Sequence, residues 1–346
     1  MIADSSCEAP PRESEPPFSG EPQDGILCDI ELPLRKSFYP LGYSVEILTN
    51  EAKVLAAAEE SFGHARFTRE ATGLEIRVGV VDHAGACCPL EPARQAFGPF
   101  FSLVADQENQ ALLDLSTGRN FIKLTGAAAE NRCYLRSNFL EKAVYLLLGA
   151  SVVTDIHAAC VGKNGKGILL CGESGAGKST LAYACARAGW TLTSDDTSYL
   201  VNDSGAPRGG DPGAPRVIGH CHRVRFRPSA RALFPELEGY AVTPRMEGKP
   251  SIEVPTSELP VERVAEEAAV ETVVFLSRRQ GARGELTRLP IGSAVERIGQ
   301  GLFSTGEIRA RHEKKLAILC NVPAYELHYE TLGEGICALD ELASDG

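Results

Sequence analysis

The sequence predicts an α/β protein in which a strand–loop–helix unit occupies the second half, preceded by a smaller α+β domain. The first observation is the segment GESGAGKST at residues 172–180, which matches the pattern G-x-x-x-x-G-K-[ST] at full length. The second is the alternation of strand-like and helix-like segments after about residue 152. The third is size, because 346 residues, 43% hydrophobic and 23% charged, suffice for two domains with apolar cores.

The N-terminal part divides into a tail and an accessory domain. Residues 1–25 hold five prolines among Glu, Ser and Gly, a composition typical of disorder. Residues 26–132 show short alternating apolar segments between turn residues, and Asn50 is suited to cap a helix. No group of residues in this domain suggests chemistry. The expected strands are 74–81, 100–104, 111–115 and 121–124, and the expected helix is 51–60.

Residues 133–346 are predicted to form the second domain. It begins with an apolar helix at 133–150, which is expected to bridge the two halves. A tight turn at 162–166 separates two strands, and a long Gly/Pro-rich loop occupies 202–215. The expected strands are 155–161, 167–171, 190–196, 251–254, 270–276 and 324–329, and the expected helices after the loop are 229–234, 293–298, 313–319 and 333–342.

The glycine-rich segment has the flanks that a phosphate-binding loop requires. An apolar strand-like run leads into it and a helical pattern leads out. Glycines allow the backbone to curve so that successive N–H groups point at phosphate oxygens, and the following helix presents its positive end to the same anion. The alternative is a glycine-rich turn without a ligand. The predicted nucleotide-binding residues are Gly172, Glu173, Ser174, Gly175, Ala176, Gly177, Lys178, Ser179 and Thr180.

Two carboxylates, Asp195 and Asp196, end the next expected strand, seventeen and eighteen residues after Lys178. In folds with a phosphate-binding loop, a carboxylate at this place faces the metal, and a second one could accept a proton from an attacking hydroxyl. We therefore expect ATP and Mg²⁺ as ligands, with Lys178 at the β- and γ-phosphates and with Ser179 and Asp196 at the metal. The alternative is a turn with two solvated aspartates.

His157 and a set of later basic residues are further candidates. A histidine inside an apolar segment is more often a satisfied core residue than a catalyst. Arginines that alternate along a strand share one face, which could bind phosphate charge in a transition state, bind an acidic substrate or face solvent. The basic candidates are Arg223, Arg225, Arg227, Arg245 and Lys249.

Composition excludes several classes of partner and location. The net charge of −11 argues against nucleic-acid binding as the main activity. No apolar run reaches the ~18–20 residues that span a bilayer, and the N-terminus has no signal-peptide pattern. The eleven cysteines form no C-x-x-C pair and are typical of reduced thiols. We therefore expect a cytoplasmic protein without a membrane or nucleic-acid partner.

These residues resemble the HPr kinase/phosphorylase superfamily, in particular HPr-kinase-like proteins that include lasso-peptide kinases. The resemblance is clearest from residue 155 to about 203, and continues more loosely through RFRPSARALFPEL and NVPAYELHYETLGEGICALDEL. It implies a P-loop kinase domain of the HPr kinase C-terminal type. It also implies that His157 is the active-site histidine, that Asp195 takes the proton from the acceptor serine, and that Asp196 lies near the metal.

The resemblance has two departures. Thr180 stands where HPr kinases usually have Glu, and no segment like LEIRGLG follows the Asp-Asp pair. These departures argue against HPr as the acceptor and against phosphorolysis. Because HPr kinases form hexamers, the resemblance also points to a homo-oligomer.

The predicted function is that of an ATP-dependent kinase. It transfers the γ-phosphoryl group to a hydroxyl, namely a serine of a peptide or protein, with Asp195, His157 and Lys178 as the catalytic residues. Two alternatives stay open: a small-molecule kinase with the same residues, and a nucleotide-binding regulatory module without turnover.

Overall fold

The computed structural model describes residues 29–65, 69, 71–82, 87–201, 214–244, 250–302 and 306–344. The disorder expected for residues 1–25 therefore concerns residues outside this description, as do Arg245, Lys249 and most of the loop expected at 202–215. The fold is mixed α/β with three sheets. Across the described ranges, every helix is too short or too polar to span a membrane.

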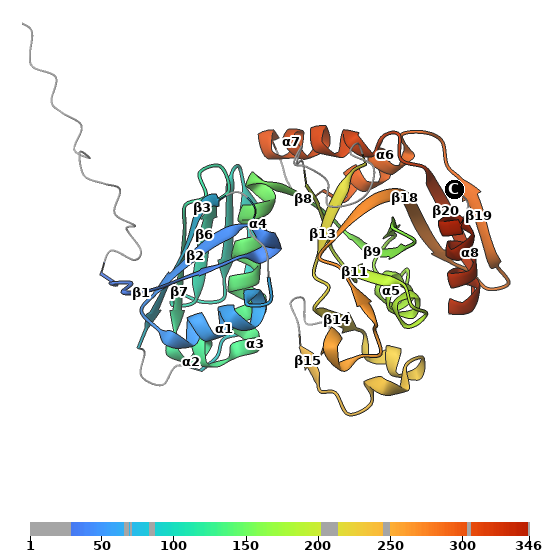
Figure 1. Cartoon of the computed structure of the whole chain (residues 1–346). Helices are drawn as coiled ribbons and strands as arrows, with labels where there is room; N and C mark the ends of the chain where they lie inside the picture. Colours follow the sequence, from blue (N-terminus) through green and yellow to red (C-terminus); the bar gives the residue numbers. More distant parts are fainter. Residues whose placement is uncertain are drawn as a thin grey trace, which may run out of the picture.

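The first half of the chain is a seven-stranded mixed sheet in the order β1-β2-β3-β7-β6-β5-β4 (Figure 1). The β2–β3 and β3–β7 pairs are parallel and the other pairs are antiparallel. A parallel neighbour requires a crossover connection, and the helix α1 supplies it between β2 and β3. The strands are β1 (Leu34–Phe38), β2 (Ser44–Thr49), β3 (Ala71–Val81), β4 (Ala93–Phe97), β5 (Phe100–Val104), β6 (Gln110–Asp114) and β7 (Asn120–Thr125).

Helices pack against this sheet around one apolar core. Ile47 and Ile76 from the sheet are buried in the same cluster as Leu147 and Leu148 from α4. The helix expected at 133–150 therefore packs on the first sheet, with a π-helical turn before α4. The helices are α1 (Ala52–Phe62), α2 (Gly126–Glu130), α3 (Arg132–Leu135) and α4 (Glu141–Ser151).

The start of α1 differs from the expectation in its capping residue. Glu51, and not Asn50, is the N-cap, and its side chain accepts a hydrogen bond from the Lys53 N–H. The Asn50 amide instead bonds to both the N–H and the C=O of Val80 on β3, each at 2.8 Å. Asn50 thus joins the loop before α1 to the neighbouring strand.

The second half contains a ten-stranded sheet whose centre is β11-β9-β10-β18. The single strand expected at 155–161 is divided at His157, because β8 pairs with β12 while β9 pairs with β10 and β11. The strands are β8 (Val153–Ile156), β9 (Ala158–Lys163), β10 (Lys166–Cys171), β11 (Thr191–Ser194), β12 (Ser198–Val201), β13 (Arg216–Gly219), β17 (Arg263–Val264), β18 (Glu267–Arg278), β19 (Arg283–Arg288) and β20 (Ala324–Tyr329).

Helices cover both faces of this sheet, because successive strand residues point to opposite sides. Ile168 and Leu170 of β10 pack with residues of α5 and α8, whereas Leu169 and Cys171 pack with residues of α6 and α7. The helices are α5 (Lys178–Arg187), α6 (Ser293–Gln300), α7 (Gly306–Leu316) and α8 (Leu332–Ser344).

A small antiparallel sheet lies beside α5. Its order is β14 (Arg223–Phe226), β16 (Pro250–Pro255) and β15 (Val242–Pro244). Val224 and Phe226 are buried with residues of α5, so Arg223 and Arg225 point to the other side of the strand. The helix expected at 229–234 is a 3-10 turn over Pro228–Ala232.

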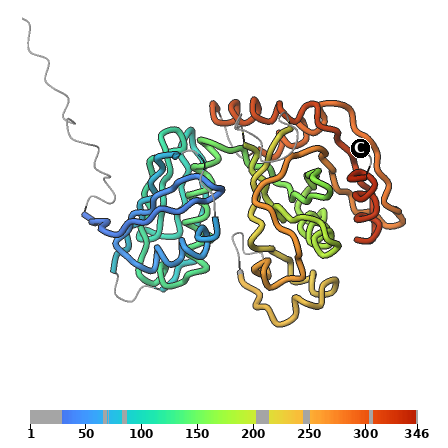
Figure 2. Tube along the Cα trace, in the orientation of Figure 1, coloured from blue at the N-terminus to red at the C-terminus, as the bar shows by residue number. Residues whose placement is uncertain are grey.

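The two halves lie side by side, with α4 on the side of the first half that faces the second (Figures 1 and 2). Tyr199 and Ile218 of the second half are buried in the core cluster of the first. Ion pairs also cross the boundary, among them Arg69–Glu267, Arg136–Glu253 and Arg225–Glu141. The domain limits expected near residues 25 and 132 stay a prediction.

Candidate active site

The topology of the second sheet brings three predicted segments to one edge. β10 and β11 both pair antiparallel with β9, so they run parallel to each other and end where β9 begins. Cys171 pairs with Ala158 and Ser194 pairs with Cys160. The loop after β10, the Asp-Asp pair after β11 and His157 before β9 therefore meet at this edge.

The loop between β10 and α5 has a backbone that requires its glycines. Gly172, Gly175 and Gly177 have φ values of 151°, 93° and 98°. A Cβ atom on Gly172 would lie 2.9 Å from the Ala176 Cβ, and one on Gly177 would lie 2.8 Å from the Tyr329 Oη. No side chain caps the start of α5, so its first N–H groups face the loop interior without a side-chain acceptor.

The Lys178 ammonium lies inside the curve of the loop. Its Nζ donates hydrogen bonds to the carbonyl oxygens of Gly172 at 2.8 Å and Glu173 at 3.2 Å. The residue is only 5% exposed, and burial lowers the pKa of its ammonium while the Asp196 carboxylate opposes that shift. The loop therefore holds one buried cation inside its curve. Glu173, Ser174 and Gly175 are exposed, and Ser179 and Thr180 are half-buried.

The two aspartates differ in environment. Asp195 is 5% exposed, and its Oδ2 accepts a 2.8 Å hydrogen bond from the backbone N–H of Arg225. The Asp196 side chain is 45% exposed, and its Oδ1 lies 3.6 Å from the Nδ1 of His157. One carboxylate is thus fixed by the backbone, and the other faces the histidine and the loop lysine.

His157 is an accessible side chain of this edge, with 54% of it exposed, and not a satisfied core residue. Desolvation and the nearby Lys178 charge lower the pKa of its imidazole, against the opposing effects of Asp196 and Asp155. The imidazole is therefore mostly neutral at pH 7.

The arginines of β14 form ion pairs with glutamates of both halves. The Arg225 guanidinium lies 3.2 Å from Glu141 Oε2 and 3.8 Å from Glu253 Oε2. Arg223 and Arg225 therefore do not form the solvated basic face that was one interpretation of the alternating arginines. Arg227, in contrast, is exposed. We call this group the arginine–glutamate network; its members are Arg136, Arg223, Arg225, Glu60, Glu141 and Glu253.

The network keeps its half-buried carboxylates ionised. Burial alone would raise the pKa of Glu141, but Arg225 and Arg136 hold it below its usual range. At Glu253, burial is again opposed by Arg225 and Arg223, and the pKa falls to about 2. Sequence reasoning missed these glutamates, since Glu141 at the start of a helix has the pattern of an ordinary surface residue.

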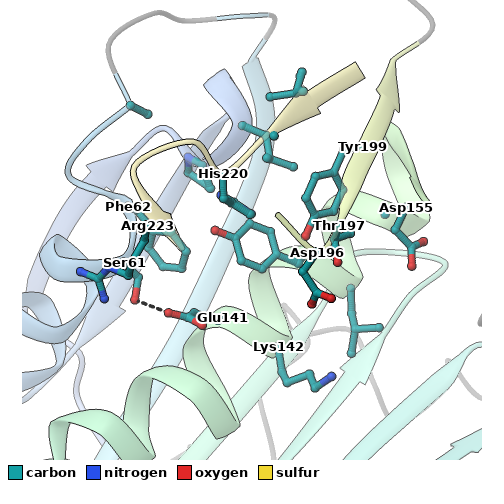
Figure 3. Close-up of a pocket in the computed structure, with 18 of the residues that line it drawn as sticks. Ser61, Phe62, Glu141, Lys142, Asp155, Asp196, Thr197, Tyr199, His220 and Arg223 are labelled. Carbon is teal, nitrogen blue, oxygen red and sulfur yellow. Dashed lines mark hydrogen bonds between the residues drawn. The ribbon is translucent and has the colours of Figure 1, made fainter. Parts of the chain in front are cut away.

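A cavity of about 330 Å³ lies between the two halves, next to the Asp-Asp pair. We call it the central pocket. The first half contributes the loop before β2, the end of α1 and one face of α4, and the second half contributes Asp155, Asp195, Asp196 and the segments around Tyr199 and His220. In Figure 3, Asp196, Thr197 and Tyr199 lie together on one side and Ser61 and Glu141 on the other. No motif in the first half predicts its contribution to this pocket.

Comparison with known proteins adds little to this geometry. No protein-family model and no curated protein matches the sequence. Among solved structures, the Hpr(Ser) kinase/phosphatase from Coxiella burnetii is similar, with a TM-score of 0.31 and 12% identity over 55% of this chain and 91% of that chain. This likeness is distant, and it assigns no role to any residue of this chain.

Proposed function

We propose that this chain is an ATP-dependent kinase that transfers the γ-phosphoryl group to a hydroxyl, with the serine of a peptide or protein as the acceptor. The observation that carries the proposal is the meeting of Lys178, His157 and the Asp-Asp pair at one sheet edge. A module that only binds nucleotide needs no carboxylate fixed beside its loop, which disfavours the regulatory alternative.

The loop fits a triphosphate. Its backbone conformations are accessible to glycine and strained for other residues, its helix start is uncapped, and Lys178 supplies a buried cation. Ser179 and Asp196 are the residues that would hold Mg²⁺. The metal, when bound, neutralises the charge that develops on the phosphate oxygens.

Asp195 is assigned as the base. The Arg225 N–H fixes its carboxylate at the wall of the central pocket, which is where an acceptor can approach. The acceptor oxygen forms a bond to the γ-phosphorus, the bond from that phosphorus to the oxygen of the ADP leaving group breaks, and the hydroxyl proton goes to Asp195. His157 lies against Asp196 and is placed to orient that carboxylate.

A small-molecule acceptor is the second candidate, and the central pocket is the observation that favours it. Both candidates predict the same first result. Incubation with radiolabelled ATP and Mg²⁺ should label an acceptor drawn from serine peptides or small alcohols. Nucleotide binding in calorimetry, without transfer to any acceptor, would instead support the regulatory module.

A further inference from the structure

The central pocket is lined by three polar groups for which the described residues provide no hydrogen-bond partner. The buried Nε2 atom of His220 has no hydrogen-bond partner in the described part of the chain. Within the same ranges, no hydrogen bond reaches the hydroxyl of Tyr145 or Tyr199. All three residues line the pocket. A buried polar group is nearly always satisfied in native proteins, so the unpaired His220 ring, together with the two tyrosine hydroxyls, makes this wall suited to a polar ligand.

These three side chains also form one aromatic group. The ring centroids of Tyr145 and His220 are 4.7 Å apart, and those of Tyr199 and His220 are 5.5 Å apart, both in edge-to-face geometry. Ring faces next to unpaired hydroxyls provide apolar contact and hydrogen bonds together, which is the usual composition of a site for a small organic molecule.

The charges of the pocket disfavour an acidic ligand. The arginines of the arginine–glutamate network are already paired with carboxylates. Lys142 also lines the pocket and has an interaction within the protein. The other end of the pocket carries Asp155, Asp195 and Asp196. His220 adds no charge at pH 7, because burial lowers its pKa to about 4.

The pocket communicates with the phosphate loop through Asp196. This residue lines the pocket and also faces His157 and Lys178 on the loop side. A volume of about 330 Å³ lies at the lower end of the range for ligand sites, roughly 300–1,000 Å³. Such a space accommodates a metabolite or one side chain of a peptide.

We infer that the central pocket is the acceptor site and that it binds an uncharged or positively charged alcohol, which is either a free small molecule or the serine side chain of a peptide. This inference rests on the proposed kinase function. Tyr145, Tyr199 and His220 bind the body of the acceptor, and its hydroxyl lies at Asp195 and Asp196, where phosphoryl transfer takes place. A free alcohol and the serine of an extended peptide present the same chemistry, and the experiment below separates them.

The test compares three acceptors that share the same sugar ring and are neutral, positively charged or negatively charged. The full chain is incubated with labelled ATP, Mg²⁺ and one of four acceptors: glucose, glucosamine, glucose 6-phosphate or a capped Ala-Ser-Ala peptide. We expect label in glucose and glucosamine, or in the peptide, to exceed label in glucose 6-phosphate at least about tenfold. Label in the sugars identifies a free alcohol as the source, and label in the peptide alone identifies a serine.

A pocket-filling variant tests the location. A Cβ atom on Gly149 meets only Asp155 Oδ1, at 3.9 Å, so the side chain of Gly149→Leu would grow into the pocket. We expect this variant to lower acceptor labelling at least about tenfold and to leave ATP affinity unchanged. Gly299→Leu is the matched control, because Gly299 is also helical, has no neighbour within 4 Å of an added Cβ and lies outside the pocket.

Tyr145→Phe provides a second test that preserves shape, in case Gly149→Leu does not fold. It should raise the acceptor KM about fivefold at constant ATP KM, as expected for one lost hydrogen bond. Tyr183→Phe is its control, since that hydroxyl bonds to Glu236 elsewhere.

The possible failures are distinguishable. Labelling by Gly149→Leu and Tyr145→Phe at the rate of the unmodified chain would overturn the pocket assignment and leave the kinase function standing. Preference for glucose 6-phosphate would overturn the assigned ligand class. No label in any acceptor with the unmodified chain would overturn the kinase function and the pocket assignment together.

Discussion

The backbone N–H of Arg225 donates a 2.8 Å hydrogen bond to the Oδ2 of Asp195. The guanidinium of the same arginine pairs with Glu141 on α4, which packs on the first sheet. One residue therefore connects the proposed base to the other half of the molecule. Any movement that separates the halves changes the surroundings of Asp195 as well as the width of the central pocket.

Asp195→Asn should abolish phosphoryl transfer while ATP still binds. The substitution keeps the size of the side chain and an oxygen that can accept from the Arg225 N–H, but it removes the group that takes the proton. Transfer is measured with labelled ATP and binding by calorimetry. Asp106→Asn, on the β5–β6 turn, is the control and should behave as the unmodified chain. Transfer by Asp195→Asn near the unmodified rate would remove this residue from the role of base.

Lys178→Met should abolish nucleotide binding without lowering the stability of the nucleotide-free protein. The buried ammonium bonds to two loop carbonyls and has no salt bridge among the described residues, so its removal should leave the Tm without nucleotide unchanged or higher. The rise in Tm on adding ATP and Mg²⁺ should disappear, because that rise measures binding to the native state. Lys166→Met on β10 is the control. A normal ATP-induced shift in Lys178→Met would contradict the role of this lysine.

Gly177→Ala should destabilise the protein more than Gly189→Ala. Both residues have positive φ values, 98° and 86°, so both substitutions incur the backbone cost of roughly 1–2 kcal/mol. Only at Gly177 would the added Cβ lie 2.8 Å from another atom, the Tyr329 Oη. Chemical denaturation measures the free energies of unfolding, and calorimetry should show a loss of ATP affinity in Gly177→Ala alone. Equal effects of the two substitutions on both quantities would argue against a specific loop geometry.

Stability should fall in acid because of the arginine–glutamate network. The pKa of Glu253 is about 2 in the folded protein, below its ordinary value of 4.5. A group with a depressed folded pKa stabilises above its unfolded pKa and loses that contribution as the pH falls through the folded value. The loss should therefore occur between about pH 5 and pH 2 and amount to roughly 3 kcal/mol.

Substitution of Glu253 tests whether this residue causes the loss of stability in acid. Glu253→Gln should lower the free energy of unfolding at pH 7 and flatten its dependence on pH below 5, as measured by urea denaturation at a series of pH values. Glu313→Gln, which removes the partner of Arg309 on the surface of α7, should leave the curve unchanged. A curve for Glu253→Gln that parallels the unmodified one would show that the network does not govern acid stability.

The positions of the candidate site residues were predictable where a short segment of sequence carries the signal. The phosphate-loop pattern, the Asp-Asp pair and His157 each adjoin a strand end, and the pairing of β9 with β10 and β11 brings these ends together. The break at His157 was not predictable, because apolar residues continue on both sides of it and only the pairing partners change. ATP, Mg²⁺ and the roles of these residues stay predictions.

Other features depend on contacts that one segment cannot reveal. The central pocket joins α1 and α4 to segments near Tyr199 and His220, which are far apart in the chain. Helix α7 begins at Gly306, seven residues before the expected start. The sequence did not predict this start, because the helix is mostly polar and only Ile308, His312 and Leu316 are buried. One buried residue per turn is a weak periodic signal.

The most direct test of the central claim is a crystal structure of the full chain with Mg²⁺ and a non-hydrolysable ATP analogue. The proposed function predicts that the γ-phosphate lies against the Lys178 ammonium and faces the carboxylates of Asp195 and Asp196, on the side open to the central pocket. A γ-phosphate bound elsewhere, or one in the loop with both carboxylates turned away and out of reach, would contradict the assignment.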